Sequence, residues 1–143
     1  MPPQPKKSEW IDVMVARVVL QDDTEQQSLH LRERGGRRGF SILIGTNEAA
    51  EIQRVLAEVE LQRPLTHQLL FEVVKALDAK VAEVRVVGLR QSTYFARLLL
   101  TKDGGEEVEV DARPSDAIAV ALRAGCPIRV AGAVMRDAST EDE

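Results

Sequence analysis

The chain has little cysteine and no long apolar run. One cysteine among 143 residues excludes an internal disulfide and suits a reducing compartment. No apolar stretch approaches the roughly 20 residues that a transmembrane helix needs, and no signal-peptide pattern opens the sequence. These absences predict a cytoplasmic protein that does not enter a membrane.

Basic charge and aromatic residues are also scarce. The formal net charge is −4, and the aromatic residues are one Trp, one Tyr and three Phe. Proteins dedicated to binding nucleic acid usually have a basic surface and aromatic platforms on which bases stack. Any role on nucleic acid must therefore depend on local geometry.

The remaining composition is that of one globular domain. With 44% hydrophobic residues, the chain is long enough to bury a core, which we expect over residues 11–135. Residues 1–10 contain three prolines and two lysines without periodicity, and residues 136–143 are mostly acidic or small after Arg136. Both ends are predicted to be disordered tails.

Hydrophobic periodicity predicts an α+β fold with a mixed, largely antiparallel sheet packed by three helices. The expected order is βββ-αα-βββ-α-β, because alternating apolar residues indicate strands and apolar residues three or four apart indicate helices. The predicted elements are a strand at 11–20, a hairpin around 29–44, helices of about 13 residues after 47 and from 66, strands at 81–90, 93–102 and 106–112, a helix at 114–124 and a strand at 127–130.

The first two helices should each bury one apolar face. The first is expected to bury a stripe and to leave Glu51 and Arg54 outside. Thr66 is placed to cap the second helix. The residues predicted to face the core are Ala49, Ile52, Leu56 and Val59 in the first helix, and Leu69, Leu70, Val73, Val74 and Leu77 in the second.

The segment from Asp111 to Val130 is the most informative part of the chain. A strand runs through Arg113 into an apolar helix, and the polar side chains before Arg123 gather at the helix start. Two of them, Asp111 and Asp116, could hold one hard cation such as Mg²⁺. The alternative is an Asp–Arg pair that locks the turn, with Ser115 or Asp116 capping the helix.

A second candidate segment is Arg63-Pro-Leu-Thr-His67. His67 falls in the first turn of a helix, where the dipole disfavours the imidazolium, so the ring should be neutral and able to accept a proton or bind a metal. Arg63 could hold a phosphate beside free backbone N–H groups. The alternative is that Thr66 caps, Arg63 pairs with an acid and His67 packs on Phe71. Glu48, at the start of the first helix, raises the same question.

Three stretches of the sequence resemble a known family. They are Ile44-Gly45 with Glu48-Ala49-Ala50, Arg63-Pro-Leu-Thr-His67 with Leu69-Leu70, and Asp111 to Ala119 through Pro127-Ile128. The chain is similar, over residues 11–135, to the bifunctional nuclease domain, also called domain of unknown function 151. One departure is Leu43, where the family commonly has an aromatic residue. The resemblance implies an α+β domain that self-associates and cleaves DNA and RNA.

Two functions follow as expectations. The first is a sequence-tolerant nuclease whose substrate is DNA or RNA, assisted by Mg²⁺ or another divalent cation. The alternative is a non-catalytic module that oligomerises or binds an anionic ligand or a protein. For the nuclease, the residues at the matching positions are expected to divide the work. We expect catalysis from Glu48, His67, Asp111 and Asp116, metal binding by Asp111 and Asp116, and substrate contacts from Arg63, Thr66, Arg113 and Ser115.

Overall fold

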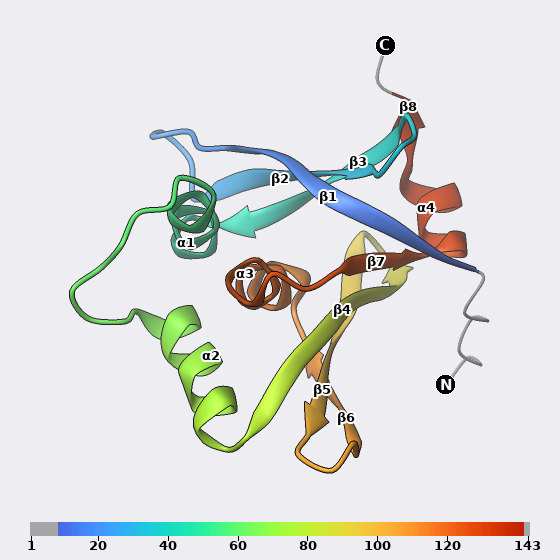
Figure 1. Ribbon diagram of the computed structural model, residues 1–143. Helices are drawn as coiled ribbons and strands as arrows, with labels where there is room; N and C mark the ends of the chain where they lie inside the picture. The colour runs from blue at the N-terminus through green and yellow to red at the C-terminus, as the bar shows by residue number, and fades with distance from the viewer. Residues whose placement is uncertain (1–8, 142–143) are drawn as a thin grey trace.

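The computed structural model describes residues 9–141 and has one eight-stranded sheet with four helices (Figure 1). The strand order is β6-β5-β4-β7-β1-β2-β3-β8, and only the β4–β7 pair is parallel. The predicted α+β class and mixed sheet are confirmed. The elements are β1 (Trp10–Val19), β2 (Gln26–Glu33), β3 (Arg38–Gly45), α1 (Thr46–Leu56), α2 (Thr66–Ala76), β4 (Ala79–Arg90), β5 (Thr93–Lys102), β6 (Glu107–Ala112), α3 (Pro114–Ala124), β7 (Ile128–Ala131), α4 (Gly132–Ala138) and β8 (Thr140–Glu141).

Helix α3 forms the centre of the core. It begins at Pro114, whose fixed φ suits the first turn, and ends at Gly125, which adopts the left-handed conformation at φ 71°. Residues 117–121 are fully buried, and the helix packs against α1, α2, β4 and β5 (Figure 1). The prediction of a buried helix at 114–124 is confirmed. The packing of α3 against α1 and α2 brings the starts of these three helices close together.

The predicted C-terminal tail is wrong over residues 136–141. Helix α4 and strand β8 occupy this part of the chain, so the domain has four helices rather than three. Val134 and Met135 are buried and anchor α4, although its seven residues are too few to show a helical period. At the other end, β1 already begins at Trp10, whose ring packs on Arg85. The rest of the predicted tails, residues 1–8 and 142–143, lies outside the described residues.

The predicted buried face of α2 is also wrong. Of its five apolar residues only Val74 is buried, and Leu77 is 75% exposed. The reason is position: α2 packs on α3 and β4 at the edge of the domain, and its other side faces outward (Figure 1). In α1, Ala49 and Ile52 are buried as expected, whereas Leu56 is exposed. The helix ends at Leu56, so Val59, also exposed, lies beyond the helix in which it was predicted. Within the described residues, no helix is long and apolar enough to cross a membrane.

Candidate functional site

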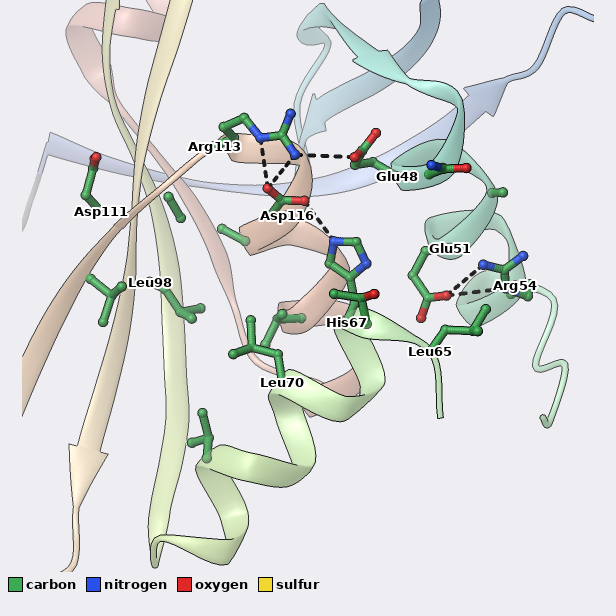
Figure 2. Close-up of a pocket in the computed structure, with 18 of the residues that line it drawn as sticks. Glu48, Glu51, Arg54, Leu65, His67, Leu70, Leu98, Asp111, Arg113 and Asp116 are labelled. Atoms are coloured by element: carbon green, nitrogen blue, oxygen red, sulfur yellow. Dashed lines mark hydrogen bonds and ion pairs between the residues drawn. The ribbon is translucent and has the colours of Figure 1, made fainter. Parts of the chain in front are cut away.

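The first turns of α1, α2 and α3 meet at one pocket with a volume of about 1010 Å³ (Figure 2). Each of these helices begins after an extended residue, Gly45, Leu65 or Arg113. The backbone N–H groups of a helix's first turn have no partner within the helix, and here three such turns border the same cavity. The polar lining includes Asn47, Glu48, Thr66, His67, Asp111, Arg113 and Asp116. The apolar lining includes Leu65, Leu70, Val74, Leu98, Leu100 and Val110.

A chain of hydrogen bonds joins the three helix starts. His67 Nε2 lies 2.8 Å from Asp116 Oδ1, and the other carboxylate oxygen of Asp116 accepts from Arg113 at 2.9 Å. Arg113 also donates to Glu48 Oε1 at 3.3 Å. The two members of the Arg113–Glu48 pair lie 65 residues apart in the sequence (Figure 2). Asp116 therefore orients both the imidazole and the guanidinium.

Arg113 is the accessible cation of this network. Its side chain is 68% exposed despite its two acidic partners, whereas the His67 side chain is only 13% exposed. The hydrogen bond and charge of Asp116, with a smaller contribution from Glu48, raise the pKa of Arg113 above its ordinary value. The guanidinium is thus permanently charged and open to an incoming anion.

Gly45 allows Glu48 to reach this network. A Cβ at position 45 would collide with the Glu48 carboxylate, which lies over the glycine. Gly45 is the N-cap of α1, and no side chain caps that helix. The Ile-Gly pair noted in the sequence therefore has a local reason: the missing side chain leaves room for an acid to fold back toward Arg113.

A buried ion pair on the α1 side of the pocket was missed by the sequence analysis. Glu51, predicted to face outward, has a side chain that is 2% exposed and accepts hydrogen bonds from Arg54 at 2.9 Å and Arg123 at 2.6 Å. Burial by itself raises the pKa of Glu51, but the hydrogen bonds and charges of the two arginines outweigh it and hold that pKa below its ordinary value. The signal was Arg123, a charge on an otherwise apolar helix, which needs an acid nearby.

Three predicted site residues lie elsewhere or play a different local part. Arg63 is exposed and does not line the pocket. Ser115 is buried and lines a neighbouring pocket instead. Thr66 lines the pocket, but Leu65 occupies the N-cap position of α2 and no side chain caps the helix.

The predicted cation ligands do not form a metal cage. Asp111 is an exposed residue paired with Arg97 on β5, apart from the His67–Asp116 pair (Figure 2). Asp116 is itself engaged by Arg113 and His67. Among residues 9–141 there is no group of three or more His, Cys, Asp or Glu side chains placed to hold a metal ion. Both predicted cation ligands are thus engaged by side chains of this chain, Asp111 by Arg97 and Asp116 by Arg113 and His67.

The fold and the pocket define a small α+β domain in which helix starts present a histidine–aspartate pair and an exposed arginine to one cavity. The bifunctional nuclease domain matches residues 29–143. The chain therefore belongs to the bifunctional nuclease domain family, which the sequence motifs predicted.

Relatives of two kinds are similar to this chain. An uncharacterized protein of Mycobacterium tuberculosis (strain H37Rv) is 40% identical over 127 residues, which cover 89% of this chain and 75% of that protein. Bifunctional nuclease 1 of Arabidopsis thaliana is 38% identical over 81 residues, covering 55% of this chain and 25% of the plant protein. Bifunctional nuclease 2 of Oryza sativa subsp. japonica is 31% identical over 114 residues, which cover 78% of this chain and 35% of the rice protein. The relatives named as nucleases are thus much longer proteins.

Proposed function

We propose that this domain is a nuclease that hydrolyses phosphodiester bonds of DNA or RNA in the candidate pocket. The observation that carries the proposal is the hydrogen-bonded chain from His67 through Asp116 and Arg113 to Glu48 at three helix starts. Membership of a family whose plant members are named bifunctional nucleases supports the same activity.

His67 is the proposed general base. A carboxylate only accepts hydrogen bonds, so Nε2 of His67 donates to Asp116, and in the neutral form of the ring the lone pair lies on Nδ1. Nδ1 makes no hydrogen bond with any other described residue. It can take a proton from a water molecule, whose oxygen then bonds to phosphorus as the P–O bond to the leaving group breaks. Asp116 fixes the ring and stabilises the imidazolium that forms.

Arg113 and the helix starts are the proposed phosphate site. The planar guanidinium pairs with phosphate oxygens through two N–H groups, and its exposure allows an anion to approach. Unpaired N–H groups and the positive ends of three helix dipoles add to the same field. Their positive potential offsets the negative charge of the acidic lining, which includes Glu48, Asp111 and Asp116.

A divalent cation such as Mg²⁺ at Asp111 and Asp116 stays a prediction, and no step above uses it. Assays in EDTA and in Mg²⁺ address it directly. Activity that disappears in EDTA and is also lost in Asp111→Asn would assign a metal to these carboxylates. Equal activity in EDTA and in Mg²⁺ would rule out a required metal ion. The cytoplasmic location expected from the single cysteine also stays a prediction.

The test of the nuclease proposal is His67→Ala, assayed on plasmid DNA and single-stranded RNA. Loss of general-base catalysis should lower the cleavage rate by about 100-fold or more. Gln68→Ala is the matched control, because it is the next residue of the same helical turn and does not line the pocket. Contaminating nucleases would act equally in both preparations. Cleavage by His67→Ala at the wild-type rate would remove His67 from the mechanism.

We also propose that the domain is a homo-oligomer in which α2 faces a second copy of the chain. Leu65, Leu69, Val73 and Leu77 are exposed and recur every four residues, which is the spacing of one ridge along a helix. Two such ridges pack against each other when a two-fold axis brings the same surface to itself. An apolar patch of this kind marks an interaction surface.

A further inference from the structure

A second pocket of about 770 Å³ adjoins the candidate pocket. The two cavities share Arg113, and consecutive residues of α3 divide between them, with Ser115 lining the second pocket and Asp116 the first. The β3–α1 junction divides in the same way, with Gly45 in the second pocket and Asn47 in the first. Two chain junctions, bridged by the Arg113–Glu48 ion pair, thus form the boundary between the pockets.

The outer edge of β3 forms one wall of the second pocket. Five consecutive residues of this strand, 41–45, line it. As far as the structure describes the chain, β3 pairs on its outer side only at Arg38 and Gly39, where β8 covers it. Alternate residues of an edge strand direct N–H and C=O groups outward. The wall therefore offers backbone donors and acceptors to a flat ligand with a hydrogen-bonding edge.

The side chains that line the second pocket combine apolar surface with hydroxyl groups. Leu43 on β3 is 64% exposed, and Tyr94 on β5 stacks on Phe40 with ring centroids 5.3 Å apart. Burial raises the pKa of Tyr94, so its hydroxyl stays protonated and can donate. Thr93 adds another hydroxyl. A nucleobase has apolar faces and a polar edge, and a sugar has hydroxyls, so both match this lining.

The charge of the second pocket also differs from that of the first. Its lining contains one acid, Asp137, and one base, Arg113. The candidate pocket is lined by four acids, Glu48, Glu51, Asp111 and Asp116, against two arginines, Arg54 and Arg113. An uncharged nucleoside fits the nearly neutral cavity, while its phosphate fits the boundary, where the guanidinium is.

We propose that the second pocket binds the nucleoside on one side of the phosphate that Arg113 holds. The inference rests on the proposed nuclease function and adds the subsite that recognises a nucleotide rather than a bare phosphodiester. A peptide strand added to the β3 edge is the competing occupant. The shared Arg113 favours the nucleotide, because it places an anion site at the mouth of the pocket.

The test compares two chromogenic diesters, thymidine 5′-(4-nitrophenyl phosphate) and methyl 4-nitrophenyl phosphate, which lacks the nucleoside. Leu43→Glu places a bulky anion in the second pocket at an already exposed position, so the fold should tolerate it. We expect KM to rise by about tenfold for the thymidine ester and to stay unchanged for the methyl ester. Leu56→Glu is the matched control, another exposed leucine, at the end of α1, that lines neither pocket.

The other outcomes separate the nucleoside subsite from the nuclease proposal. A Leu43→Glu variant that treats both esters as the wild type does, or slows both equally, overturns the subsite. If the wild type cleaves neither ester, the plasmid and RNA assay decides the nuclease proposal, and amide chemical shifts of residues 41–45 in a titration with thymidine 5′-monophosphate decide the subsite separately. Shifts in the wild type that vanish in Leu43→Glu retain a nucleotide site without cleavage. An absence of shifts overturns it and leaves the β3 edge to a peptide.

Discussion

At the scale of single residues, the site depends on one side chain that is missing. Gly45 leaves the space in which the Glu48 carboxylate lies, and Glu48 in turn contacts Arg113. The backbone of Gly45, at φ −74° and ψ 162°, is one that any residue can adopt. Position 45 therefore requires glycine for the sake of its neighbour rather than for its own conformation.

This reasoning predicts the effect of Gly45→Ala. The free energy of unfolding should change by less than about 1 kcal/mol, because Ala suits this backbone and the colliding group is the end of a flexible side chain. Activity should fall by about tenfold, since the displaced Glu48 no longer holds Arg113. Gly88→Ala is the control, because its Cβ meets only an ordinary contact with Phe95 at 3.9 Å. Full activity in Gly45→Ala would show that the Glu48 contact is dispensable.

The sequence identified most of the polar residues that line the candidate pocket but could not pair them. Glu48, His67, Arg113 and Asp116 stood out because polar residues at helix starts are informative one helix at a time. The partner of His67 is 49 residues away, and the chain folds it into contact only through the packing of α2 on α3. Ser115 and Asp116 are adjacent in sequence, yet they line different pockets because neighbouring helical residues point in different directions.

At the scale of elements, Glu51 connects α1 to α3. Its carboxylate accepts hydrogen bonds from Arg54 of the same helix and from Arg123 near the end of α3. Glu51 is therefore satisfied, like every other buried side-chain nitrogen or oxygen among the described residues. Replacing one member of a buried ion pair leaves the others desolvated and unpaired. The contact therefore fixes how α1 lies against the central helix, and with it the position of Glu48.

Glu51→Gln is predicted to destabilise the domain in a pH-dependent way. At pH 7 the free energy of unfolding should fall by about 2 kcal/mol. Because the folded-state pKa of Glu51 lies below the ordinary 4.5, its charge stabilises the fold above that pH, and the contribution is lost as pH falls through the folded-state value.

The measurement is thermal unfolding of both proteins between pH 3 and pH 8. The gap between wild type and Glu51→Gln should be widest near neutrality and should narrow below about pH 4. Glu60→Gln, at an exposed position, should follow the wild type throughout. A gap that is constant with pH would show that packing, rather than the charge of Glu51, is lost.

At the scale of the whole molecule, the sequence predicted elements better than their surroundings. Helix α3 was predicted residue for residue because proline and glycine mark its ends and its apolar residues cover every side. The α2 pattern equally predicted a helix, but periodicity shows that a face is apolar and not what covers it. In this chain the core buries only Val74 of the predicted face, and the ridge of Leu65, Leu69, Val73 and Leu77 is left on the surface.

The exposed ridge of α2 gives the prediction that tests the assembly. If a second copy covers it, Leu69→Glu combined with Val73→Glu buries charge at the contact and should convert the oligomer to a monomer, because an unpaired charge in an apolar interface costs several kcal/mol. Neither residue lines the candidate pocket, so methyl 4-nitrophenyl phosphate turnover reports separately on the site. Leu56→Glu adds the same charge to an exposed leucine outside the ridge and should leave the mass unchanged. Light scattering after size exclusion measures the mass directly. A wild-type chain that is monomeric at all concentrations would contradict the proposed contact between α2 helices. A double variant that keeps the wild-type oligomeric mass would contradict it as well.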